Sequence, residues 1–194
     1  MSRGRTGLVL LLFAVPVILI VAVVAVLFGL DAVHDDGRWT AVNKSCPTLD
    51  SGVATALGMA PAPLADDSSR GAHDTSELRN CFYSPGGDTN DALQVTVSLH
   101  QGGVLKNSHD AAVAAADDNP PSGFRPLGAN SSGNRFGDRG AGSGRLVLIS
   151  VVDNAQVRVQ IYNREKLADA SDADSAALRA PMQTVADQAV KNLG

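Results

Sequence analysis

The sequence predicts an α+β domain, in which an antiparallel sheet is packed by helices, preceded by an N-terminal transmembrane helix. Three observations support this prediction: a long apolar run near the N-terminus, several segments of alternating polar and apolar residues, and a C-terminal segment with apolar residues at helical spacing. The predicted elements follow in the order helix, hairpin, helix, hairpin and helix, which is typical of α+β domains.

The apolar run covers residues 8–30 and contains no charged residue. As a helix it would be about 34 Å long, enough to cross a hydrocarbon core of about 30 Å. A cleavable signal peptide is the alternative. Its apolar region is usually about 7 to 15 residues long and ends at a small-x-small site, which Leu30-Asp31-Ala32 matches poorly. We therefore expect residues 8–30 to be an uncleaved anchor in the lipid bilayer.

The charges that flank this run predict its orientation. Arg3 and Arg5 precede it and aspartates follow it, so the positive-inside bias places residues 1–7 in the cytoplasm. The remainder of this single-pass protein of the cell membrane is then extracytoplasmic. We divide it into a juxtamembrane linker at 31–45 and a domain at 46–194.

The composition of the exported part limits its partners. Without Arg3 and Arg5, 14 basic and 20 acidic residues remain, a net charge of −6. An acidic domain without a basic stripe argues against nucleic acid as a partner. About 160 residues are enough for one domain with its own core. Trp39, the sole tryptophan, is expected to pack on this domain, with the lipid headgroups as the alternative location.

The first elements of the domain are a helix and a hairpin. Helical spacing predicts a helix at 48–57, which Thr48 or Ser51 can cap and Gly58 can end. Residues 59–76 have no period and are expected to form a surface loop. Strands at 80–84 and 92–100 flank a turn-forming segment and predict an antiparallel hairpin.

A second hairpin is predicted from strands at 145–152 and 155–162, joined by Asp153 and Asn154. The first of these strands is apolar on both faces and is therefore expected to be central, whereas the second alternates. A short strand is expected near 134–136.

The remaining elements are helices. Ser108 can cap one at 110–117, and an alanine-rich turn or helix is expected at 172–179. Pro181 suits the first turn of a terminal helix, whose apolar stripe should lie against the sheet and comprises Met182, Val185, Ala186, Ala189, Val190 and Leu193. We expect these helices to cover one face of the sheet.

Cys46 and Cys81 are the only cysteines. Lipidation requires a cysteine directly after the apolar run, whereas Cys46 lies 16 residues beyond it. Zinc needs about four ligands, and no second cysteine or paired histidine lies at ligand spacing. A catalytic thiol would leave the other cysteine unexplained. Two cysteines in an oxidising exterior most economically form one disulfide.

The sequence predicts no catalytic, cofactor-binding or metal-binding residues. The histidines at 34, 73, 100 and 109 are scattered. The segment GAGSG, at 140–144, precedes a strand and lacks the Lys-Ser/Thr of a phosphate loop, so a flexible turn is expected. No GxSxG elbow is present. The acidic cluster at 172–174 lacks the rest of a calcium loop and fits the start of a helix.

The extracytoplasmic part resembles a family through three features. Cys46 precedes the short helix TLDSGVATALG, Cys81 is followed by the aromatic pair Phe82-Tyr83, and RFGDRGAGSGRLVLISVVDNAQVRVQIY precedes a terminal helix that ends AVKNLG. From residue 45 to 194 this resembles actinobacterial cell-envelope domains of unknown function. These domains occur in many small secreted lipoproteins and are related to the sensor domains of certain mycobacterial receptor kinases.

Two departures from this family stand out: it usually attaches through a lipidated cysteine, and tryptophan is frequent where Phe82-Tyr83 stands. The resemblance implies a module that binds a ligand or a membrane protein partner and is not an enzyme, with no catalytic residues to transfer. Two alternatives remain open: a structural accessory subunit of a membrane complex, and a hydrolase whose site is assembled only by folding.

Overall fold

The computed structural model describes residues 37–42, 46–70, 76–86, 91–103, 106–118, 120–138, 143–163 and 167–193, and for 65–70 and 76–78 only the backbone. The predicted cytoplasmic segment and the transmembrane helix at 8–30 lie outside these residues. Within the described ranges, no helix is long and apolar enough to cross a membrane. The described residues form an α+β domain with an antiparallel sheet, as predicted.

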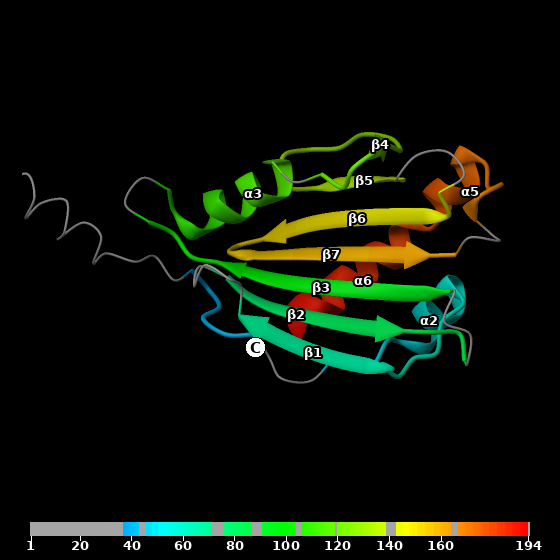
Figure 1. Ribbon diagram of the computed structural model, residues 1–194, viewed down its shortest axis with the longest axis horizontal. Helices are drawn as coiled ribbons and strands as arrows, with labels where there is room; N and C mark the ends of the chain where they lie inside the picture. Colours follow the sequence, from blue (N-terminus) through cyan, green and yellow to red (C-terminus); the bar gives the residue numbers. More distant parts are fainter. Residues whose placement is uncertain are drawn as a thin grey trace, which may run out of the picture.

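The described strands pair antiparallel throughout in a seven-stranded sheet of order β1-β2-β3-β7-β6-β5-β4 (Figure 1). They are β1 (Ala65–Arg70), β2 (Ser76–Tyr83), β3 (Ala92–His100), β4 (Arg125–Pro126), β5 (Arg135–Asp138), β6 (Arg145–Val152) and β7 (Ala155–Tyr162). Both predicted hairpins are present, and the pairing of β3 with β7 joins them into one sheet.

The β6–β7 hairpin has the predicted two-residue turn, in which Asp153 adopts a positive φ of 52°. Such a turn matches the right-handed twist of the strands it connects. β6 lies between β7 and β5 and is buried on both faces, in agreement with its apolar sequence.

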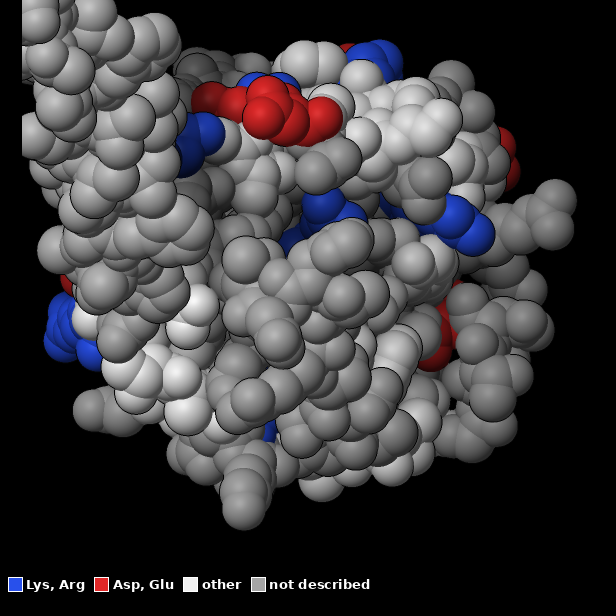
Figure 2. All heavy atoms as spheres, turned by 60° about the vertical axis from the view of Figure 1, so that its left-hand side comes forward, with Lys and Arg blue, Asp and Glu red and all other residues white. Residues whose placement is uncertain are grey.

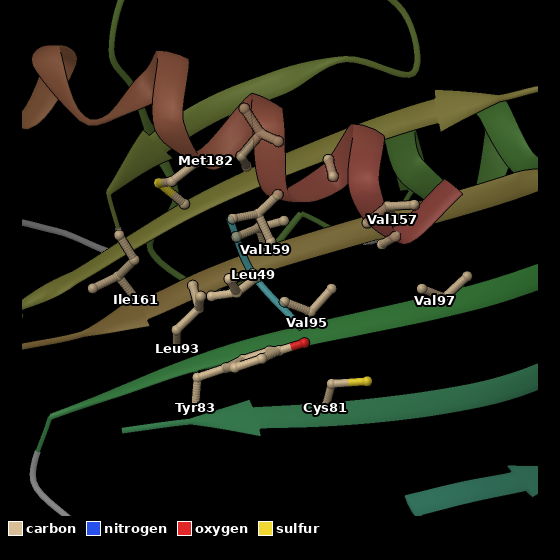
Figure 3. Packing of buried hydrophobic residues seen from close by; sticks show 14 of the residues in the cluster. Leu49, Cys81, Tyr83, Leu93, Val95, Val97, Val157, Val159, Ile161 and Met182 are labelled. Carbon is tan, nitrogen blue, oxygen red and sulfur yellow. The ribbon is translucent and has the colours of Figure 1, made fainter. Parts of the chain in front are cut away.

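Helices α2 (Ser51–Leu57), α5 (Asp172–Ala177) and α6 (Arg179–Lys191) account for three of the predicted helices. The C-terminal stripe of α6 packs on the sheet, with Met182 and Val185 at 0% and 1% exposure. In Figure 3 the apolar side chains of β3 and β7 point to the side on which α6 carries Met182. Each fully buried side chain of this size contributes about 1.5–3 kcal/mol. This layer is the main core of the domain.

The opposite face is covered in part by α3 (Ser108–Asp118), whereas one covered face was expected. Ala116 of α3 packs against Val147 and Ile149 of β6, with Phe124 beside them. The reason is the sequence of β6, whose second apolar face also has to be removed from water. Because Ala116 is small, the helix can lie close to the strand.

Two further differences concern segments of weak periodicity. β1 lies within the segment 59–76 that we expected to be a loop. It is an edge strand held by backbone pairing to β2, and polar residues such as Asp66 and Asp67 suit an edge. α3 begins earlier than expected, because Asn107, and not Ser108, accepts the N–H of Asp110 with its side chain.

Helices α2 and α5 are bounded by identifiable capping residues. Gly58 ends α2 in the left-handed conformation, as predicted, but Asp50 is its N-cap residue and makes no side-chain cap bond. At α5, Ser171 and Asp174 form a capping box. The acidic cluster at 172–174 therefore belongs to a helix start, as expected.

Candidate binding surface on the polar face of the sheet

The predicted disulfide between Cys46 and Cys81 is present, with the two Cα atoms 5.7 Å apart. It fastens the chain before α2 to β2, next to the bond that the Tyr83 hydroxyl donates to the carbonyl of Pro47 at 2.6 Å. Cys81 is 1% exposed, and no free cysteine occurs among the described residues. The cysteine pair therefore has a structural role.

The histidines are not brought together. His100 contacts Gln156, and His109 contacts the carbonyl of Asp153, while the positions 34 and 73 lie outside the described residues. In the described part of the chain no three His, Cys, Asp or Glu side chains are placed to hold a metal ion.

The most distinctive surface is the side of β2, β3 and β7 that faces away from α6, here called the polar face. Because side chains alternate along a strand, the pairing registers assign its members. These are Asn80, Phe82, Gln94, Thr96, Ser98, His100, Gln156, Arg158, Gln160 and Tyr162. α3 covers this side of β6, where Ala116 packs, and also contacts β3 and β7. Amides and hydroxyls dominate the face.

Hydrogen bonds within the polar face leave one buried amide donor, that of Gln160, unused. Thr96 Oγ1 donates to Asn80 Oδ1 at 2.8 Å, and Gln94 Nε2 donates to the same oxygen at 3.4 Å. Gln160, which is 6% exposed, has no acceptor for its Nε2 group. A buried donor without a partner lowers the stability of the fold by about 1–3 kcal/mol, so the presence of Gln160 at this position needs an explanation.

Two aromatic residues lie near the same end of the polar face, on its two outer strands β2 and β7. Phe82 pairs with Gln94, which pairs with Gln160, and Tyr162 lies two residues beyond Gln160. With standard strand spacings the Cα atoms of Phe82 and Tyr162 are about 12 Å apart. Both rings are partly exposed, and the amides lie between them.

Arg145 of β6 pairs with Tyr162 of β7, so its side chain lies on the same side of the sheet as the Tyr162 ring. Its guanidinium carbon is 4.8 Å from the centroid of the Tyr162 ring, a cation–π arrangement. Arg145 also lines a cavity of about 310 Å³, here called the end cavity. The other residues that line it are Arg125, Asp138, Ser143, Gly144, Leu146, Leu167, Ala168, Ala170, Asp172 and Ser175. By strand alternation the Arg145 side chain lies on the side of Tyr162, whereas Leu146 and Asp138 face the α5 side, so the polar face and the end cavity lie on opposite sides of the sheet.

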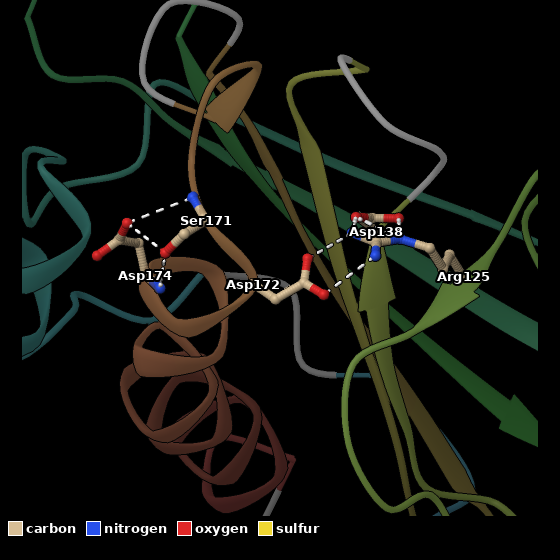
Figure 4. A network of polar contacts seen from close by, with 5 residues as sticks. All are labelled: Arg125, Asp138, Ser171, Asp172 and Asp174. Carbon is tan, nitrogen blue, oxygen red and sulfur yellow. Dashed lines mark hydrogen bonds and ion pairs between the residues drawn. The ribbon is translucent and has the colours of Figure 1, made fainter.

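One wall of the end cavity is an ionic cluster (Figure 4). Arg125 Nη2 lies 2.6 Å from Asp138 Oδ2 and 2.8 Å from Asp172 Oδ1, so one guanidinium joins β4 and β5 to α5. Hydrogen bonds, first to Asp138 and then to Asp172, raise the pKa of Arg125. The bond from Arg125 lowers the pKa of Asp172. Both shifts favour the charged forms of Arg125 and Asp172.

A wider and more open groove of about 810 Å³ lies beside α3, between Pro120–Phe124 and the turn at 131–134. Asp117 organises it by accepting bonds from Ser132, the N–H of Gly133 and Arg135. These bonds, that from Ser132 first, lower the pKa of Asp117. Since its carboxylate is fully engaged, Asp117 holds the turn in place.

Charges elsewhere are mixed. Figure 2 shows basic and acidic side chains interspersed over the described part of the face that it presents. The expectation that nucleic acid is not a partner stays a prediction.

The fold and these surfaces define an α+β domain with one disulfide, a partly enclosed polar sheet face and a small cavity beside α5. A scan against protein-family models and a search of curated proteins found no match to this chain.

Sequence reasoning identified the disulfide but neither surface. Alternation along each strand puts Gln94, Thr96 and Gln160 at polar positions, but only the pairing of β3 with β7 joins them. The end cavity combines residues from four separate segments of the chain, which no local pattern indicates.

Proposed function

We propose that this is a single-pass protein of the cell envelope whose extracytoplasmic domain binds glycan chains on the polar face. Residues 8–30 are the membrane anchor and residues 1–7 are cytoplasmic. The chain already packs on the domain at Gly37, so the six residues 31–36 can span at most about 21 Å. The binding surface is therefore held close to the membrane, where envelope polymers pass.

The observation that carries the proposal is the unused Nε2 group of Gln160, which lies with Gln94 between two aromatic rings. Sugar hydroxyls both donate and accept hydrogen bonds, and so do side-chain amides. The Nε2 group of Gln160 lacks a hydrogen-bond acceptor. A sugar hydroxyl would supply this acceptor once the side chains that bury Gln160 move aside. The apolar C–H faces of sugar rings stack on aromatic rings, for which Phe82 and Tyr162 are available.

An ordinary solvated sheet face is the simpler explanation, and two features argue against it. The members of the polar face are partly or fully buried, with Gln156 at 8% and Gln160 at 6% exposure. A face that only meets water usually carries charged side chains. Here Arg158 is the cation among ten residues, and no described side chain of the polar face is a carboxylate.

The same composition favours binding over hydrolysis. Most glycoside hydrolases place two carboxylates on either side of the scissile bond. Asp138 and Asp172 do not belong to the polar face and are bound to Arg125 at the end cavity. We therefore assign the domain a binding role without catalysis.

The proposal is tested with the full chain in detergent micelles, incubated with insoluble peptidoglycan and titrated with soluble neutral and acidic oligosaccharides. We expect Phe82→Ala and Gln94→Ala each to weaken binding about tenfold, or about 1.4 kcal/mol. Lys191→Ala, an exposed change on α6, is the matched control. Unchanged melting temperatures show that the variants are folded. Binding that is absent in the wild type, or equal in all variants, would contradict the proposal.

The topology has its own test. Alkaline phosphatase is active only after export, so fusion after residue 194 should give an active enzyme. An inactive fusion would overturn the orientation while leaving glycan binding by the purified protein untouched.

A further inference from the structure

We infer that one end of the domain rests on the lipid headgroups of the bilayer that holds residues 8–30, with the aromatic end of the polar face directed away from the membrane. The contacting end, here called the turn end, is formed by residues 37–38, the β6–β7 turn, Lys106 and the first turn of α3. The inference rests on the proposed membrane anchor and adds a contact surface and an orientation.

The first argument is how the chain joins the domain. Asn154, in the β6–β7 turn, bonds both backbone groups of Trp39. It also donates to the carbonyl of His100 at 3.3 Å, and its own carbonyl accepts the N–H of His100 at 2.9 Å. Gly37 packs so closely on Asn154 that a Cβ atom would not fit there. Residues 37–39 are therefore fixed to the turn end and do not lengthen the tether.

The second argument compares the reach of this tether with the length of the sheet. Residues 31–36 span at most about 21 Å, of which the headgroup layer takes up about 5 Å. β3 has nine residues, so its ends at Ala92 and His100 are about 26 Å apart. Because residue 37 lies at the His100 end, an inverted domain would hold it about 26 Å above the bilayer, beyond the reach of the tether.

The third argument is the chemistry of the turn end. Its exposed charged side chains have both signs and comprise Arg38, Lys106, Asp110 and Asp153. Residues 37–194 as a whole carry 14 basic and 17 acidic side chains, so the other surfaces are on average more acidic. A negative lipid surface therefore favours contact through the turn end over a domain lying on its side.

The apolar surface agrees with this contact. In the described part of the chain, the large apolar side chain that is exposed is Leu64, at 68%, and it precedes β1 at the opposite end of the sheet. The turn end presents charged groups instead, which suit the headgroup layer and not the hydrocarbon core.

The orientation also places the proposed glycan site. Tyr162 lies seven residues along β7 from Ala155, which adjoins the turn, so it lies up to about 23 Å farther from the bilayer. Phe82 lies near the same end. In Figure 1 the turn end is on the left, where α3 begins, and α2 and α5 mark the opposite end. Glycan chains outside the membrane would thus meet the aromatic end first.

Quenching of tryptophan fluorescence by nitroxide-labelled lipid headgroups tests the orientation, with the full chain in lipid nanodiscs. Trp39 is the sole tryptophan and is bonded to the turn end. Trp39→Phe with Lys106→Trp keeps a tryptophan at this end, and Trp39→Phe with Leu64→Trp moves it to the opposite end. Quenching by a water-soluble nitroxide corrects for the exposure of each indole. We expect at least twofold stronger lipid quenching at positions 39 and 106 than at position 64.

Equal quenching at positions 64 and 106 would mean that the domain lies on its side, and stronger quenching at 64 would mean that it is inverted. Either result overturns the inference. A chain that does not enter the nanodiscs overturns the proposed anchor and the inference with it. Glycan binding is measured separately in micelles, so its failure would leave the orientation standing.

A further variant tests the attachment at Asn154. Asn154→Ala, made together with each tryptophan change, releases residues 37–39 from the turn and should reduce the difference in quenching between positions 106 and 64. Thr48→Ala, at an exposed position, is the matched control and should leave this difference unchanged. A difference that survives in full in Asn154→Ala would overturn the orienting role of the attachment.

Discussion

The side-chain amide of Asn154 hydrogen-bonds both backbone groups of Trp39, a residue 115 positions earlier in the chain. The N–H of Trp39 donates to Asn154 Oδ1 at 3.1 Å, and Asn154 Nδ2 donates to the carbonyl of Trp39 at 2.8 Å. Asn154 is fully buried and Trp39 is 8% exposed. Gly37 approaches so closely that a Cβ atom there would overlap Asn154. Residues 37–42, which we had predicted as linker, are thus fastened to the β6–β7 turn.

The first prediction concerns this attachment. Asn154→Ala should lower the free energy of unfolding by about 2–3 kcal/mol, because it leaves two backbone groups of Trp39 without partners. Denaturant unfolding of the full chain in detergent, followed by fluorescence of the sole tryptophan, measures the change. Thr48→Ala, at an exposed position, should be nearly neutral. A loss below about 0.5 kcal/mol would show that water replaces Asn154 at no cost.

Local patterns predicted much of the fold. The bounds of β6, β7 and β3 agree with the alternating segments, because strict alternation or an apolar run between turn residues is a local property. β1 was missed because backbone pairing alone holds an edge strand, which leaves its side chains without a period. The position of α3 was missed because helical spacing says nothing about which face of a sheet a helix covers.

The candidate site was less predictable than the fold. Cys46 and Cys81 could be paired from their number and expected compartment. The contact between Arg145 and Tyr162 depends on a strand register, and the cluster around Arg125 depends on sheet order and on the place of α5. Such combinations arise from topology, so a single sequence offered no local signal for them.

The second prediction concerns the disulfide. Its removal in Cys46→Ser with Cys81→Ser should cost about 4 kcal/mol, since the bond closes a loop with a sequence separation of 35. Unfolding curves with and without dithiothreitol measure the effect. Reductant should destabilise the wild type by a similar amount and leave the double variant unchanged. The prediction would be wrong if the wild type, denatured in the presence of dithiothreitol, showed the same free energy of unfolding as without it.

The third prediction concerns Asp117. Asp117→Asn should lower stability by about 1–2 kcal/mol at pH 7, because the amide cannot accept all the bonds from Ser132, Gly133 and Arg135. The pKa of Asp117 is lowered by folding, so its contribution is complete above the unfolded pKa of about 4 and is lost as the pH falls through the folded value.

The gap between wild type and Asp117→Asn should therefore be constant from pH 7 to about 5 and narrow below about 4. Equilibrium unfolding as a function of pH measures this gap. Asp118→Asn, at the exposed neighbouring position, is the matched control and should be nearly neutral. A gap that widens in acid would mean that Asp117 acts through something other than its charge.

The last prediction concerns His100 on the polar face, whose Nε2 atom lies 3.1 Å from Gln156 Oε1. Burial lowers the pKa of His100 and outweighs the opposing effect of the bond to Gln156. Between the folded pKa and the unfolded value of about 6.5, the unfolded chain holds more protons. Stability should thus fall as the pH drops below about 6.5 and level off below the folded pKa.

His100→Gln removes this titration while preserving a side chain that can donate to Gln156, so the variant should gain relative to wild type between pH 7 and pH 5. His109→Gln, on the exposed side of α3, controls for loss of a histidine. Nuclear magnetic resonance titration of the His100 ring measures its pKa directly. A value at or above 6.5 would contradict the prediction. A lowered value means that His100 adds no charge to the polar face at neutral pH, which leaves Arg158 as the cation among the amide and hydroxyl groups that suit sugar hydroxyls.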